Sequence, residues 1–215
     1  SGTEAAVCGG VTTLIEYAVP DEGGRIMPAL DARLEAAAGR SHCDYSFHLI
    51  LRQVTDETLD DMTLAVERGF PSFKIFTAYE GFRLAGEEIL KAMARAKGLG
   101  ALICVHAEDG ALISFATDQL ARSGETEVRH YPEAHPYAAD LSATSQVISY
   151  AHHVGGRVHI AHVNTSEAAR MVRQAKASGL EITAETCPHY LLFTDDVYRS
   201  GRPEAHYYVL APAIR

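Results

Sequence analysis

The sequence predicts an α/β protein in which short parallel strands alternate with longer helices, as in a (β/α)8 TIM-type barrel. Six short apolar runs alternate with six helical patterns along the 215 residues. Metal-ligand side chains stand near the carboxyl ends of three of these runs, which is where barrel active sites are built. About six βα units can be counted rather than eight. We therefore expect residues 1–215 to form a single, incomplete barrel domain.

The strand candidates cover residues 10–18, 44–51, 72–77, 101–106, 157–164 and 181–186. Most are rich in Val, Ile and Leu without strict polar alternation, as expected for strands that are covered on both faces. The helix candidates between them cover residues 25–38, 59–67, 86–97, 110–123, 141–154 and 166–178. A doubly wound open sheet is the competing architecture. Because no G-x-G-x-x-G turn follows the first strand, the barrel is favoured.

Charge and composition exclude several functional classes. The formal net charge is −9, which argues against nucleic-acid or anionic-membrane partners because both need a basic face. No apolar run approaches the roughly 18 residues of a membrane span, and the first residues do not resemble a signal peptide. The four cysteines, Cys8, Cys43, Cys104 and Cys187, are isolated and form no CxxC pair. We expect reduced thiols in a cytoplasmic protein.

Lys74 is the most informative residue, because it lies inside the apolar run of residues 71–79. Burial disfavours the charged form of lysine and lowers its pKa, and a neutral amine can capture carbon dioxide to form an anionic carbamate. Two later runs end on His106 and His162, which supply nitrogen ligands. Taken singly, such residues are more often solvent-reaching lysines or hydrogen-bonded core histidines. Together, on three strands, they indicate a metal hydrolase.

Period-two alternation assigns these side chains to faces of the strands. His106 should share its face with Cys104. His162 should point into the barrel, whereas His159, three residues earlier, should point outward against a helix. Glu108 and Asp109 should either orient ligands or begin the next helix. The histidines expected in solvated loops are His42, His130, His135 and His206.

Five stretches, in order, resemble the cyclic-amidohydrolase family of hydantoinases and dihydropyrimidinases. They are Gly9-Gly10-Val11-Thr12-Thr13, Ser72-Phe73-Lys74-Ile75-Phe76-Thr77-Ala78-Tyr79, Val105-His106-Ala107-Glu108, Ala161-His162-Val163 and Glu185-Thr186-Cys187-Pro188-His189-Tyr190. The resemblance implies a metal-dependent barrel accompanied by a small β-sandwich domain. It also implies hydrolysis of a cyclic amide, a hydantoin or a dihydropyrimidine, to an N-carbamoyl amino acid.

The resemblance also implies roles for individual residues. Lys74 would be the carboxylated lysine that bridges two divalent metal ions, usually zinc, with a bridging hydroxide as nucleophile. His106 and His162 would bind the second metal ion. Tyr79 would donate its hydroxyl to the oxyanion that forms on the attacked carbonyl. Members of the family commonly form homotetramers.

Two parts of the family's site have no counterpart in these residues. The family carries a His-x-His pair on the first barrel strand and an aspartate on the last. We therefore expect the 215 residues alone to be inactive, with the activity belonging to a longer protein. Allantoinases and dihydroorotases share the architecture and stay open as alternatives. So does a non-catalytic, dihydropyrimidinase-like scaffold, which should purify without stoichiometric zinc.

Overall fold

The strands of this protein form one open, wholly parallel sheet. The computed structural model describes residues 2–199 and 203–215, and in these ranges six strands pair in the order of the sequence. The strands are β1 Thr13–Ala18, β2 Asp44–Ile50, β3 Ser72–Phe76, β4 Leu102–His106, β5 Arg157–Ile160 and β6 Ile182–Ala184. Each new strand pairs with the strand before it in the sequence and extends the sheet in the same direction, so the strand order never reverses. This is the winding of a barrel, and it excludes the doubly wound alternative.

The six predicted helices are present with shifted ends. They are α2 Ile26–Ala37, α3 Asp56–Glu67, α4 Gly86–Gly98, α5 Gly110–Ser123, α7 Tyr137–Val154 and α8 Ser166–Ala177. Helix α3 starts three residues before the expected position because the Thr55 side chain caps it, accepting a hydrogen bond from the Thr58 backbone N–H. Short elements complete the described chain: α1 Gly2–Cys8, η1 Val128–His130, α6 Tyr131–Ala134, α9 Pro188–Leu192, α10 Asp196–Arg199 and η2 Pro203–Tyr208.

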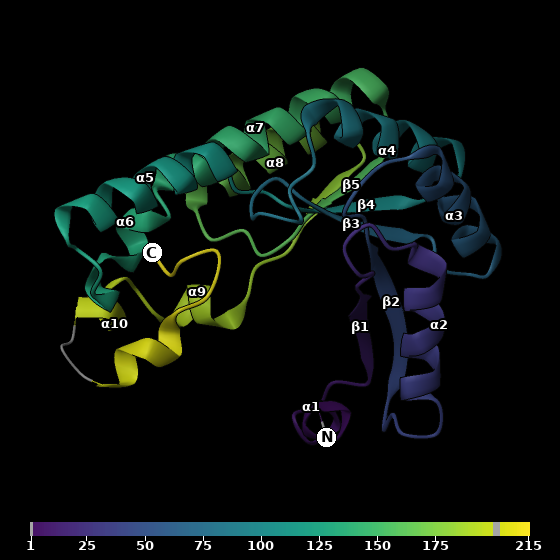
Figure 1. The fold of residues 1–215 in the computed structure, drawn as a ribbon, viewed down its shortest axis with the longest axis horizontal. Coiled ribbons are helices and arrows are strands. Elements are labelled where there is room, and N and C mark those ends of the chain that lie inside the picture. Colours follow the sequence, from purple (N-terminus) through teal and green to yellow (C-terminus); the bar gives the residue numbers. More distant parts are fainter. Residues whose placement is uncertain (1, 200–202) are drawn as a thin grey trace.

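Helices α2, α3, α4, α7 and α8 lie along one side of the sheet (Figure 1). Alternate strand residues such as Phe73, Ile103 and Val158 pack against them in one continuous apolar cluster. The residues between these positions point to the other side, which we call the inner face. The inner face carries Tyr17, His48, Lys74, Cys104 and His159. The sheet therefore has an apolar, helix-covered face and an inner face rich in polar groups.

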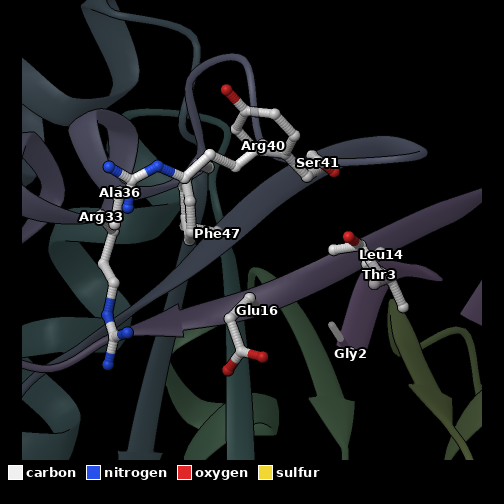
Figure 2. A pocket seen from close by; sticks show the side chains of 11 residues that line it. Gly2, Thr3, Leu14, Glu16, Arg33, Ala36, Arg40, Ser41 and Phe47 are labelled. Atoms are coloured by element: carbon white, nitrogen blue, oxygen red, sulfur yellow. The ribbon is translucent and has the colours of Figure 1, made fainter. Parts of the chain in front are cut away.

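The two edge strands, β1 and β6, do not pair with each other. Ile15 in β1 is 54% exposed. On the helix side of β1, a hollow of about 610 Å³ lies between α1, α2 and the strand, lined by Leu14, Glu16, Arg33 and Arg40 among others (Figure 2). None of the predicted site residues lines this hollow. It is a feature of the open sheet edge and lies apart from the inner face.

The last segment of the chain is tied down by side-chain hydrogen bonds. Tyr131 and Tyr190 donate from their hydroxyls to the carbonyls of Leu210 and Pro212, at 3.0 and 2.7 Å. The Ile214 backbone N–H donates to the Tyr198 hydroxyl at 3.0 Å. Figure 1 shows this segment returning to α5 and α6. Within the described ranges, no helix combines the length and the apolar character needed to cross a bilayer.

Candidate metal centre

Lys74 lies at the centre of the inner face. The strand register places it beside Cys104, which in turn lies beside His159. Its side chain is buried, with the residue only 2% exposed, and its Nζ is 4.0 Å from the Cys104 Sγ. Among the described residues, no carboxylate forms an ion pair with this amine. Burial lowers the pKa of Lys74, partly offset by Cys104 and Glu185. The amine is thus shifted towards its neutral, nucleophilic form.

His106 and His162 meet edge to face at the carboxyl ends of β4 and β5. His106 Nδ1 and His162 Nε2 are 2.9 Å apart, and the ring planes cross at 67°. Burial lowers the pKa of both imidazoles, that of His162 to about 2. Both rings are therefore neutral at physiological pH. Neutral imidazole is the form that binds metal ions, and these two nitrogens face each other at hydrogen-bonding distance.

Phe76 links the lysine to the histidine pair. The Lys74 Nζ lies 5.1 Å from the centroid of the Phe76 ring, and the His106 ring stacks on it at 5.4 Å. Phe76 and His106 are also direct neighbours in the register of β3 and β4. The fold thus brings Lys74, His106 and His162, which are up to 88 positions apart in the sequence, into one cluster on the inner face.

The Glu108 carboxylate connects His106 of this cluster to two further side chains by hydrogen bonds. Its side chain is fully buried, and its two oxygens accept three hydrogen bonds. Oε2 accepts from the His106 Nε2–H at 2.8 Å and the Tyr79 hydroxyl at 2.7 Å, while Oε1 accepts from the His135 Nδ1–H at 2.9 Å. Burial raises the pKa of Glu108, but the hydrogen bonds from His106 and His135 outweigh it and hold the pKa well below the usual range. An ionised Glu108 only accepts, so neutral His106 has its lone pair on Nδ1, facing His162.

Tyr79 and His162 have a backbone conformation that is rare for their residue types. Among the described residues, they are the only non-glycine residues with positive φ, 72° for Tyr79 and 41° for His162. Such conformations cost about 1–3 kcal/mol each and tend to occur at functional sites. Burial, followed by the charge of Glu108, raises the pKa of Tyr79. The phenol therefore stays protonated and can act as a hydrogen-bond donor.

Two sequence-based assignments of histidines are wrong. His159 lies on the inner face instead of against a helix, with its Nδ1 2.8 Å from the Thr183 hydroxyl. Regular alternation would then turn His162 away, but β5 ends at Ile160 and the left-handed backbone at His162 turns its ring back to His106. His135, expected in a solvated loop, is 7% exposed and bonded to Glu108. The sequence around His135 carries no periodic pattern that would reveal this.

The sequence predicts that Glu108 and Asp109 either orient ligands or begin the next helix, and each residue has one of these two roles. Glu108 orients His106, as described above. Asp109 caps α5, because its Oδ1 accepts from the backbone N–H groups of Ala111 and Leu112 at 2.9 and 3.3 Å. The two imidazole nitrogens of His106 and His162 are ligands of the kind that a borderline metal such as zinc binds.

The parallel, sequentially ordered sheet and the polar groups at its carboxyl edge define the class: part of a (β/α) barrel. No protein-family model matches the chain. A D-hydantoinase from Streptomyces coelicolor is 37% identical over 216 residues, which cover 100% of this chain and 46% of that protein. The crystal structure of dihydropyrimidinase from Brevibacillus agri NCHU1002 has a TM-score of 0.96 at 30% identity, covering 100% of this chain and 47% of that one. A dihydroorotase from Campylobacter jejuni shares only the fold, with a TM-score of 0.59 and 15% identity over 88% of this chain and 49% of that one.

The chain is therefore a homologue of the hydantoinases and dihydropyrimidinases along its whole length, and the resemblance seen in its sequence is confirmed. The predicted α/β barrel fold is confirmed by the same structures. The chain spans about half the length of the curated relatives that it matches.

Proposed function

We propose that this chain contributes to a metal-dependent cyclic amidohydrolase, which opens the ring amide of a hydantoin or dihydropyrimidine to give an N-carbamoyl amino acid. The observation that carries the proposal is the buried Lys74, which forms no ion pair with a carboxylate in the described part of the chain, together with two neutral histidines that face each other. A structural role would give the amine a carboxylate or a path to solvent. Homology to proteins named D-hydantoinase supports the choice of reaction.

We propose that Lys74 becomes carboxylated. Its neutral amine adds to carbon dioxide, forming an N–C bond and releasing one proton, which leaves an anionic carbamate. The pKa of Lys74, lowered by burial, provides the free amine for this addition. The product supplies two carboxylate-type oxygens next to the two histidines.

The carbamate on Lys74, together with His106 and His162, would hold two divalent metal ions, most readily zinc. Bound metal ions supply activated water and polarise the amide carbonyl. The chain's own residues orient this centre. Glu108 holds the His106 ring, and the Thr77 hydroxyl lies 2.8 and 2.7 Å from the carbonyl oxygens of His106 and Glu108, which fixes the end of β4. In the family, further ligands come from a His-x-His pair and an aspartate.

Tyr79 would stabilise the oxyanion that develops on the attacked carbonyl. Its phenol is protonated, and its single proton is donated to Glu108 Oε2. To stabilise an oxyanion, the Tyr79 hydroxyl must donate its proton to the substrate oxygen instead of to Glu108 Oε2. Glu108 would then hold the donor in place before substrate binds, which reduces the cost of ordering it.

The remaining proposals concern the domain, the cellular location and the oligomeric state of the protein. Residues 1–215 would form part of a catalytic barrel domain, in view of the six strands and the half-length match to the relatives. The four free cysteines support a cytoplasmic location, because disulfides are rare there. A homotetramer is proposed from the family resemblance, and light scattering on the intact protein tests it.

The test uses the intact protein, purified from its native source. Its mass and its metal content are measured first. Its ring-opening activity is then assayed on hydantoin, dihydrouracil, allantoin and dihydroorotate. We expect about two zinc ions per subunit and hydrolysis of hydantoin or dihydrouracil. Preference for allantoin or dihydroorotate would assign the protein to those enzymes instead. A metal-free, inactive protein would identify a scaffold and overturn the proposal.

A further inference from the structure

Of the three hydrogen bonds to the Glu108 carboxylate, two come from residues of the predicted centre and one comes from His135. His106 and Tyr79 have roles there, but His135 lies 27 residues further along the chain and has none. His135 is 7% exposed, and its Nδ1 lies 2.9 Å from Oε1, the carboxylate oxygen to which neither His106 nor Tyr79 donates. His135 therefore determines how the Glu108 carboxylate is rotated.

Neighbouring contacts hold His135 in this position. The Tyr131 ring packs on it with centroids 4.8 Å apart, and the Tyr131 hydroxyl is bound to the Leu210 carbonyl. Helix α7, which starts two residues after His135, is joined to the end of β4 by the Asp109 N–H, which donates to the Ala139 carbonyl at 3.0 Å. A rigid support of this kind is what an orienting residue needs.

We propose that His135 is a positioning residue of the metal centre, an inference that rests on the proposed function. By donating to Glu108 Oε1, it fixes the carboxylate so that Oε2 receives the His106 Nε2–H. The His106 lone pair then stays on Nδ1, facing His162. Without His135, the carboxylate can rotate, and His106 can adopt the other tautomer or turn its ring. Partners of this kind typically change metal affinity by about 10–100-fold.

Three variants of the intact protein separate the hydrogen bond from the bulk of the ring. His135→Asn places an amide N–H near the position of Nδ1 and preserves the donor. His135→Gln places the amide one bond farther away, near Nε2, and loses the bond to Glu108. His135→Leu removes all polarity. His153→Leu is the matched control, because His153 is exposed on α7.

Two readouts are measured: the zinc dissociation constant by chelator competition, and the His106 tautomer in the metal-free protein by ¹⁵N NMR of the imidazoles. We expect His135→Gln and His135→Leu to weaken zinc binding by about 10–100-fold and to reduce the Nε2–H tautomer. His135→Asn and His153→Leu should behave like the wild type.

Wild-type affinity and tautomer in His135→Gln and His135→Leu would overturn the inference, as would an equal loss in His135→Asn. If His135→Leu does not fold, the Asn and Gln pair alone decides. If the wild type binds no zinc, the proposed function fails, while the tautomer measurement still judges the role of His135.

Discussion

Replacing Lys74 by methionine should change stability in opposite directions with and without metal. The lysine is 2% exposed, and its Nζ has a hydrogen-bond contact with the Cys104 Sγ at 4.0 Å. A buried amine whose hydrogen bond goes to a weak sulfur acceptor is poorly compensated for its lost hydration, which costs about 1–3 kcal/mol, and methionine fills the same unbranched shape with apolar atoms. We therefore expect the metal-free variant to be more stable than the wild type by about 1–2 kcal/mol.

With excess zinc, the order should reverse. A ligand present at 100 times its Kd stabilises the folded state by about 2.7 kcal/mol, and the variant lacks the group that would become the carbamate ligand. The wild type should therefore gain stability on adding zinc and bicarbonate, while the variant gains little. Thermal unfolding of the intact protein, in carbon-dioxide-free buffer with chelator and then with zinc, measures both effects.

Lys176→Met is the control, because Lys176 is exposed on α8 and its replacement should change stability by less than about 0.5 kcal/mol. A metal-free Lys74→Met protein that is less stable than the wild type would refute the reasoning, since the amine would then be well satisfied. An equal gain from zinc in both proteins would exclude Lys74 from the metal centre.

Three other variants test separate parts of the structure. Tyr79→Phe should lower kcat by about 10²–10³-fold with zinc content unchanged, if the phenol stabilises the oxyanion; unchanged kcat would remove it from catalysis. Thr77→Val should cost about 1–2 kcal/mol in urea unfolding, because the carbonyls of His106 and Glu108 lose their shared donor. Burial raises the pKa of Asp140 to about 6, and Arg215 at 3.1 Å offsets this only partly. Because folding raises this pKa, the wild type should lose about 2.4 kcal/mol relative to Asp140→Asn as the pH rises from 4 to 7; a constant difference would contradict the shift.

Much of the fold is present in the local chemistry of the sequence. The apolar runs and the helical patterns predicted the six strands and the six longest helices of the described residues, because burial on one or two faces imposes a period on the side chains. The same period placed Lys74 and Cys104 on the inner face correctly, since β3 and β4 are regular. The roles of Lys74, His106, His162 and Tyr79 stay predictions until metal content and activity are measured.

The sequence by itself determined which side chains lie near the carboxyl ends of the strands. Only the tertiary structure decided how they meet. His162 faces His106 because β5 ends at Ile160 and the backbone turns left-handed, which strand periodicity does not encode. His135 reaches Glu108 because the first turn of α7 is hydrogen-bonded to Asp109, in the segment that follows β4. Contacts between residues far apart in the chain depend on how whole elements pack, and no local pattern of residues records that.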